Sequence, residues 1–362
     1  EEFERAANNH QQLGVLSAYH QLSASIDLIN LVSDQLLEEW RKNRPDIVIA
    51  DFITLSGGLV ANQLGIPWIT TMATQFVLET TDGPPCLIGG MGSPKNSWQA
   101  TIQFLGRKAT RIVKRIVFFS FRDRLKRYKF KVYNQLGQET IYSPYSILAI
   151  GMKELELKKG FPEHFRWVGP SGASVEAGED YHLDLTPFRE RKKVLVTCGT
   201  QLAWAKDNLI YQAKQLAKAH PDCHFFVTRG VGGEAFQCEN LMENLSVVSY
   251  LPYKEYIPQM DYVIHHGGAG IFYQCIIYGK PALILPHDYD QFDYAVRGVE
   301  AGIAFTAKRD NSKAIGQAFE KLLAKENWPE LETLRQAAQS YHPTEILESE
   351  IQRLLADKEK EK

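Results

Sequence analysis

A glycine-rich turn between a strand and a helix carries the clearest chemistry in this sequence. Residues 262–265 form a short apolar strand, residues 266–270 read His-Gly-Gly-Ala-Gly, and a helical pattern covers 271–279. The unpaired N–H groups at the start of a helix carry a partial positive charge that suits a diphosphate. Glycines let the backbone approach such an anion closely, and His266 can donate a ring hydrogen to it. The turn therefore predicts a phosphate-binding site; the alternative is a tight turn whose glycines serve packing alone.

A polar pair follows on what we expect to be the same edge of the sheet. After a turn over residues 279–281, an apolar strand over 282–286 leads to Asp290 and Gln291. Open parallel sheets bind ligands beyond the carboxyl ends of their strands. Asp290 can accept hydrogen bonds from sugar hydroxyls, and Gln291 can both donate and accept. Phosphate and sugar contacts are therefore expected together, between residues 198 and 297.

Two rounds of strand and helix are expected to position these residues. A long helix over 11–42, a buried strand over 46–52, a helix to Leu64 and a strand over 67–71 form a β-α-β unit. A second round starts after a polar stretch, with strands expected over 193–198, 224–228, 246–250, 262–265 and 282–286. Alternation of this kind is typical of doubly wound parallel sheets.

We therefore predict an α/β protein of two domains. The first domain covers 1–170, a linker rich in Gly, Ser and acidic residues covers 171–190, and the second domain covers 191–362 with a charged helical tail. The 362 residues are 44% hydrophobic, which is enough for two cores.

Composition excludes several classes of protein. The formal net charge is −2, so no global charge attracts nucleic acid. The five cysteines are odd in number, widely spaced and without a CxxC pair, which indicates neither a disulfide framework nor a zinc site. No apolar run reaches the roughly 18 residues that a membrane span needs, and no signal peptide is visible. We expect a cytoplasmic protein.

The run from 261 to 297 resembles the donor-binding signature of the UDP-glycosyltransferase family. That signature has His-Gly-Gly-x-Gly, a Gly-x-Pro turn, a strand ending in Pro, and Asp-Gln, in the order found here. The family consists of inverting enzymes with the GT-B fold, two facing Rossmann-like domains with parallel sheets. Cys198-Gly199-Thr200, Tyr250-Leu251-Pro252 and Trp167-Val168-Gly169-Pro170 resemble further family segments, so the match covers 45–72 and 165–305.

The resemblance implies a set of donor contacts and shows three departures. The donor-binding residues would be Gly199, Thr200, Leu251, His266, Gly267, Gly268, Gly270, Gln274, Asp290 and Gln291, and Arg297 matches a position that is often Arg. Ile271 replaces a usual Thr or Ser, Gln274 replaces a usual Glu that holds the ribose hydroxyls, and Tyr294 replaces a frequent Asn. An amide still bonds a hydroxyl, but without the help of a charge. The implied reaction transfers a hexose, expected to be glucose, from a UDP-sugar.

The catalytic base of the family is not identified. Inverting transfer needs a base for the acceptor hydroxyl; in the family this is a His oriented by an Asp, and Asp51 matches the Asp. The matching His should lie well upstream, and neither His10 nor His20, both on the first predicted helix, is assigned that role. We therefore expect an incomplete N-terminal domain. A non-catalytic or partner-dependent donor-binding subunit stays open as an alternative, as does an epimerase or hydrolase.

We expect no metal and no cofactor besides the UDP-sugar co-substrate. Asp288-Tyr289-Asp290 looks like the Asp-x-Asp metal motif of another glycosyltransferase architecture, but it falls within the predicted sugar-contact loop. Without a metal, neutral or cationic donors must stabilise the leaving diphosphate, which returns that task to the helix N-terminus.

A basic stretch indicates a second surface. Residues 107–131 hold eleven Lys and Arg residues against the single acid Asp123, with apolar residues interleaved, inside a helix predicted over 100–136. A basic amphipathic helix suits an anionic membrane surface, on the cytosolic face, and the acceptor is expected to be small and lipophilic and to lie near the loop 72–98. The alternative is a solvated helix whose apolar stripe faces the core.

Overall fold

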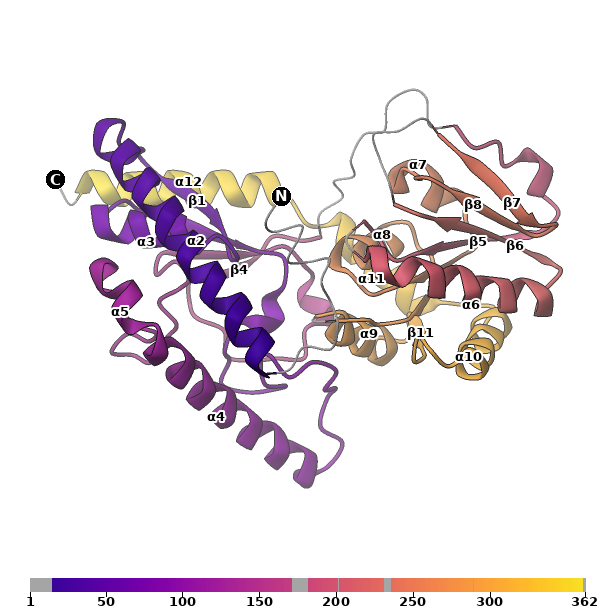
Figure 1. Ribbon diagram of the computed structural model, residues 1–362, viewed down its shortest axis with the longest axis horizontal. Coiled ribbons are helices and arrows are strands. Elements are labelled where there is room, and N and C mark those ends of the chain that lie inside the picture. Colours follow the sequence, from indigo (N-terminus) through magenta and orange to yellow (C-terminus); the bar gives the residue numbers. More distant parts are fainter. Residues whose placement is uncertain (1–14, 171–181, 201, 231–235, 289, 361–362) are drawn as a thin grey trace. The chain divides into compact units, whose positions relative to one another are not determined.

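The computed structural model divides the chain into two compact units, each described by itself (Figure 1). It describes residues 15–170, 182–200, 202–230, 236–288 and 290–360. Unit 1 comprises Glu1–Ile88, Ser93–Gly169 and Tyr341–Lys362, and unit 2 comprises Gly89–Gly92 and Pro170–Ser340. The predicted linker 171–190 falls largely outside the described residues, which resume at 182. In these described ranges no helix is long and apolar enough to cross a membrane.

Unit 1 is built on a four-stranded parallel sheet in the order β1-β2-β3-β4. Its strands are β1 (Val48–Asp51), β2 (Trp68–Met72), β3 (Ser146–Ala149) and β4 (Phe165–Trp167). The long α2 (Val15–Lys42) precedes β1, and α3 (Leu55–Leu64) joins β1 to β2. A left-handed Gly65 ends α3, as glycine does at many helix C-termini. The β-α-β unit predicted over 46–71 is confirmed.

The basic helix is shorter than predicted. It consists of α4 (Ser97–Ser120), the one-turn α5 (Arg122–Leu125) and a 3₁₀ turn over Lys126–Tyr128. Lys129 has a left-handed φ of 51°, and Tyr133 forms an isolated bridge with Glu139. A left-handed residue cannot continue a right-handed helix, so the prediction of a helix through 136 is wrong beyond Tyr128.

The C-terminal tail packs on unit 1. In Figure 1 the yellow helix α12 (Pro343–Lys360) lies beside the unit 1 elements, and its Leu354 belongs to a buried cluster with Ile69 and Leu148. The Lys358 ammonium donates to Asp46 Oδ1 at 2.9 Å. The sequence analysis placed this tail in the second domain, and the structure corrects that boundary. The helix has an apolar stripe, but periodicity does not say which sheet the stripe covers.

Unit 2 contains a seven-stranded sheet in the order β11-β10-β9-β5-β6-β8-β7. The strands are β5 (Lys192–Thr197), β6 (Cys223–Thr228), β7 (Cys238–Met242), β8 (Leu245–Val248), β9 (Tyr262–His265), β10 (Ala282–Ile284) and β11 (Ala304–Thr306). All neighbours pair in parallel except β7, which is antiparallel to β8. The five predicted strands are confirmed, and β7 and β11 are additions.

Unit 2 has helices between its strands and two more, α10 (Ser312–Ala324) and α11 (Pro329–Gln339), after its last strand. The helices between the strands are α6 (Lys206–Ala219), α7 (Tyr253–Tyr256), α8 (Ala269–Ile277) and α9 (Gln291–Glu300). The central strands β5 and β6 are apolar on both faces, with Val194, Phe225 and Phe226 fully buried. Such strands need helices on both sides of the sheet. The result is a doubly wound sheet, as predicted.

A substitution in α12 tests whether this helix stabilises unit 1. Leu354→Ala removes a side chain that is only 3% exposed and should lower the free energy of unfolding of unit 1 by about 2–4 kcal/mol. Hydrogen exchange should then rise in β2 and β3 and stay unchanged in β5 and β6. The exposed Leu136→Ala is the matched control and should change neither. Faster exchange in unit 2 would contradict the assignment of the tail.

Candidate functional site

The carboxyl ends of β5 and β9 meet at the point where the strand order of unit 2 reverses. The chain proceeds from β5 outward through β6 and β8, and then returns to the other side of β5 with β9. Thr197 and His265 are in register, so the turns that follow both strands start side by side. A methyl group placed on Gly199 would lie 3.1 Å from Cε1 of His266. The predicted turns at 199–200 and 266–270 therefore form one site, at the position where open α/β sheets bind ligands.

The N-terminus of α8 has no side-chain cap. Gly268 is the N-cap residue, and Phe272 donates the first intrahelical bond to Gly268 O at 3.0 Å. The preceding N–H groups of the first turn cannot be paired within the helix. Gly270 is exposed, and a methyl group there would meet no atom within 4 Å. This turn presents a positive backbone surface without a side chain in the way.

Glycine is required beside this turn for steric reasons. Gly267 has φ +92°, and a methyl group on it would lie 2.9 Å from Gln291 O. A methyl group on Gly268 would lie 2.4 Å from Nε2 of His266. The glycines thus let the turn after β9 pack closely against the start of α9 and against the imidazole of His266. This brings Gly267, Gly268, His266 and Gln291 together.

Two adjacent histidines are neutral in this site. Burial, together with His266, lowers the pKa of His265 to about 3, and burial, together with His287, lowers the pKa of His266 to about 4. Nδ1 of His265 accepts from Gly267 N–H at 3.0 Å, so the proton of the neutral ring is on Nε2. His266 is partly exposed and can donate one ring hydrogen to an anion without being charged.

Gln274 is a buried polar group without a partner. It lies on α8 and is 2% exposed, and among the described residues neither atom of its side-chain amide forms a hydrogen bond. An unsatisfied buried amide costs about 1–3 kcal/mol. Gln274 therefore has bonding capacity that a ligand hydroxyl would satisfy.

The predicted donor contact Leu251 is also buried, after the end of β8. In the next residues, the Tyr253 hydroxyl lies 2.9 Å from Thr197 Oγ1, at the end of β5.

The predicted sugar contacts stand at the start of α9. Asp290 is its N-cap residue, without capping the helix through its side chain. Gln291 is buried, and its Oε1 accepts from the backbone N–H groups of His287, at 2.8 Å, and Asp288, at 3.2 Å. The side-chain oxygen of Gln291 therefore holds the preceding loop in place. This leaves the NH₂ group of the same side chain to donate hydrogen bonds to a ligand. Arg297 is buried within α9, 3.7 Å from Asp293 Oδ1.

Comparison with known proteins shows which proteins this chain resembles. Residues 232–352 match the family model "Erythromycin biosynthesis protein CIII-like, C-terminal domain". The chain is 25% identical over 274 residues to the NDP-glycosyltransferase YjiC of Bacillus subtilis (strain 168), covering 74% of this chain and 62% of YjiC. The chain is thus similar to glycosyltransferases, and the matches support the predicted resemblance to the UDP-glycosyltransferase family.

Solved structures of glycosyltransferases share the fold. The glycotransferase of kitacinnamycin matches 93% of this chain and 83% of its own, with a TM-score of 0.73 and 20% identity. The glycosyltransferase VinC, solved in complex with dTDP, matches 96% of this chain and 84% of its own, with a TM-score of 0.59 and 16% identity. The predicted GT-B fold is confirmed.

Asp51, the residue predicted to orient the base, lies in unit 1. Asp51 ends β1 and is exposed, and its Oδ1 accepts from Ile53 N–H at 3.0 Å, which tightens the turn into α3. One oxygen thus has a structural role, as expected of a residue at a strand-to-helix turn. Its predicted role in orienting a base stays a prediction. His10 lies outside the described residues.

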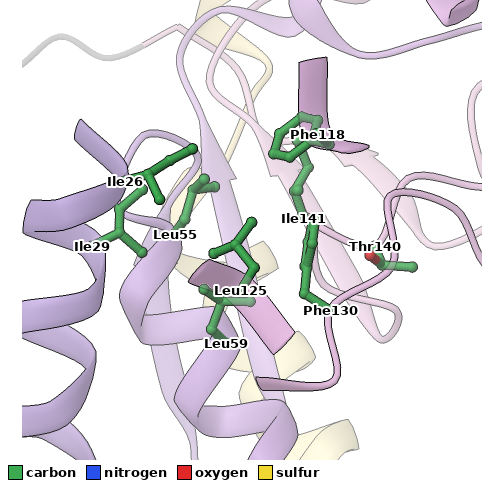
Figure 2. A pocket seen from close by; sticks show the side chains of 9 residues that line it. All are labelled: Ile26, Ile29, Leu55, Leu59, Phe118, Leu125, Phe130, Thr140 and Ile141. Atoms are coloured by element: carbon green, nitrogen blue, oxygen red, sulfur yellow. The ribbon is translucent and has the colours of Figure 1, made fainter. Parts of the chain in front are cut away.

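Unit 1 also contains an apolar pocket (Figure 2). Its lining comes from α2, α3, the ends of α4 and α5, and the loop that precedes β3. Eight of the nine side chains are apolar, and Thr140 is the exception: Ile26, Ile29, Leu55, Leu59, Phe118, Leu125, Phe130, Thr140 and Ile141. The cavity has a volume of only about 20 Å³, about the space that one water molecule needs, so it is a packing gap between these elements and not a site for an acceptor. None of these residues belongs to the loop 72–98, which the sequence analysis placed near the acceptor.

Sequence reasoning missed a cluster beside the donor turns. Trp204 packs edge-on against His287, with ring centroids 5.7 Å apart, and the Arg309 guanidinium lies 4.7 Å from the Trp204 ring centroid. Arg309 also donates to His287 O at 3.1 Å. These residues are not spaced regularly, so no pattern could have united them. Tyr289 is not described, and within the described parts of the chain no group of three His, Cys, Asp or Glu could hold a metal.

The buried histidines make stability depend on pH. His265 and His224 are each 1% exposed, with pKa values lowered by burial to about 3 and about 4. In the unfolded chain both rings take up a proton near pH 6.5, whereas in the folded protein they do not. The free energy of unfolding should therefore fall between pH 6.5 and 4, by on the order of 1 kcal/mol per pH unit for each ring. Urea denaturation at several pH values measures this slope.

A variant distinguishes the contribution of the histidine rings to this slope from that of carboxylates that titrate in the same pH range. His224 contacts Ser246 Oγ at 2.8 Å, away from the donor turns. His224→Gln keeps a polar partner there and removes one titrating ring, so the slope should decrease by that ring's share. A slope equal to that of the wild type would show that His224 does not contribute.

Proposed function

We propose that the chain binds a UDP-sugar, with the diphosphate at the first turn of α8. The supporting observation is the uncapped helix start at the strand-order reversal, bordered by Gly199 and His266. Helix N–H groups and a neutral imidazole donor stabilise a diphosphate without a metal ion. The departure at Ile271 removes a hydroxyl donor but leaves these backbone donors in place.

The rest of the donor would occupy the neighbouring groups. Gln274, with both amide atoms unpartnered, would bond the ribose hydroxyls, and Leu251 would offer its backbone to the base. Asp290 and the NH₂ of Gln291 would hold the hydroxyls of a hexose, which we propose to be glucose. The complex of VinC with dTDP supports a nucleoside diphosphate as the ligand class.

We propose that the hexose is transferred with inversion to the hydroxyl of a small lipophilic acceptor, in the cytoplasm. Asp51, at the end of β1, would orient the base. The transfer reaction is part of the proposal, because the chain covers only 62% of the length of YjiC.

Gly270 provides the sharpest test of donor binding. A methyl group there meets no protein atom, so Gly270→Ala should leave the melting temperature unchanged or raise it slightly, because Ala favours a helix over Gly. The same methyl group would stand on the surface where we place the diphosphate. We expect UDP to bind at least about tenfold more weakly, a loss of about 1.4 kcal/mol, as measured by calorimetry.

Gly316→Ala is the matched control. Gly316 lies in α10 of the same unit, also with no atom within 4 Å of an added methyl group, and its variant should bind UDP as the wild type does. dTDP is titrated in parallel, and tighter binding of dTDP would replace UDP as the proposed nucleotide. Equal UDP affinity in the Gly270→Ala variant and the wild type would remove the diphosphate from this turn.

Asp51 tests the transfer step separately. UDP release from UDP-glucose is measured with lipid, phenolic and macrolide alcohols as acceptors. Asp51→Asn should lower kcat by about 10²-fold or more, in the range seen for general-base catalysis, with the affinity for UDP unchanged. Asp123→Asn, at an exposed acid of the same unit, should have no effect. UDP binding without release for any acceptor would instead favour the donor-binding subunit.

A further inference from the structure

Helix α4 turns its apolar face outward. Its inner side buries polar residues, namely Gln103, Thr110 and Lys114. Large apolar side chains are exposed along the opposite side, at the three- and four-residue spacing of a single helical stripe: Trp98 (71%), Ile102, Leu105, Ile112, Ile116 (65%) and Phe119. A helix on the surface of a soluble domain normally has the reverse arrangement. We call this exposed stripe, from Trp98 to Phe119, the α4 face.

Buried ion pairs hold the helix in this orientation. The Lys114 ammonium forms a salt bridge with Glu139 and lies 3.4 Å from Glu79, and Arg111 lies 3.4 Å from the same Glu79. Burial alone would lower the pKa of Lys114, but the Glu139 carboxylate raises it above the usual value. Rotating α4 to bury its apolar face would leave Glu139 buried and unpaired, which costs several kcal/mol. The exposure of the α4 face is therefore enforced by the structure.

The charge around the α4 face has one sign. Residues 97–120 contain no Asp or Glu. Lys108, Arg115 and Arg122 are exposed at intervals of seven residues, which places them in one row beside the stripe. Throughout the described ranges, no carboxylate lies within ion-pair distance of Lys108 or Arg115. Arg122 lies 3.9 Å from the exposed Asp123, so Lys108 and Arg115 are the cations of the row that are available to an anionic surface.

Two further cations of the basic stretch have partners within unit 1. Arg124 lies 3.2 Å from Asp27, and Arg127 lies 2.8 Å from Asp34, both on α2. These pairs fasten the region after α4 to α2. The α4 face therefore does not include these two cations, and it extends toward the N-terminus to Trp98.

We propose that the α4 face docks on an anionic lipid bilayer, with α4 lying parallel to the membrane plane. The apolar stripe would enter the boundary between headgroups and acyl chains, with Trp98 at the interface, and the row of cations would contact lipid phosphates. A helix of 24 residues spans about 36 Å. A second copy of this chain fits the α4 face less well than an anionic bilayer does. Neither of the two faces would contain an acidic residue, so their positive charges would repel each other.

Vesicle co-sedimentation tests the proposal on the full chain. Vesicles of phosphatidylcholine alone are compared with vesicles containing 30% phosphatidylglycerol, a composition chosen on the order of that of natural anionic membranes. The wild type should bind the anionic vesicles at least about tenfold more tightly. The double variant Leu105→Glu/Ile116→Glu should lose this binding with an unchanged melting temperature, because both side chains are exposed. The matched control Leu31→Glu/Tyr211→Glu, at exposed sites on α2 and α6, should bind as the wild type does, apart from the small effect of two added charges.

The cationic row is tested by Lys108→Gln and Arg115→Gln. Each should weaken binding to anionic vesicles about fivefold and leave binding to neutral vesicles unchanged. Indifference of the wild type to phosphatidylglycerol would overturn the proposal. So would a concentration-dependent dimer that the double variant abolishes, since it would identify a second copy as the occupant. UDP affinity is measured on the same variants and should not change, which keeps this proposal separate from the donor site.

Discussion

The unpaired N–H groups at the start of α8 are the constraint around which the donor-side turns of unit 2 are arranged. A positive helix end is useful only where the backbone is accessible, and here three features make it accessible. Gly268 caps the helix without a side chain, Gly270 keeps its outer surface clear, and Gly267 takes a left-handed conformation that lets the turn pack on α9. The neighbouring position of β5 then brings Gly199 close to the ring of His266, which follows β9. Together these features would allow the close approach of the anion that we propose.

The same site contains polar groups that the protein alone does not satisfy. Gln274 and Nε2 of His265 are buried without partners among the described residues. Leaving them so reduces stability, since each unsatisfied group costs on the order of 1 kcal/mol or more. Binding sites commonly accept such a cost in exchange for function. At Gln274 the unmet bonds lie on the helix whose N-terminus we assign to the diphosphate, so one ligand would satisfy both.

The sequence predicted what local patterns encode. Apolar runs identified the central strands of both sheets, and the glycine turn after residue 265 identified the start of α8 within two residues. The order of motifs indicated the resemblance that the comparisons support. Tertiary choices were not predictable in this way. The stripe of α12 is visible in the sequence, but the sheet that it covers is not, and the cluster of Trp204, His287 and Arg309 is brought together only by the fold.

Helix α4 shows why a helical stripe alone does not determine its direction. A periodic apolar pattern is normally assigned to the core, because burying it is favourable by about 25 cal/mol per Å². Here the charged residues decide instead. Lys114 and Arg111 point inward to Glu79 and Glu139, and turning the helix over would leave these carboxylates without their partners. The carboxylates lie far from α4 in sequence, at positions 79 and 139. The decisive information is therefore non-local, and an apolar surface held outward by buried charge needs a binding partner to account for it.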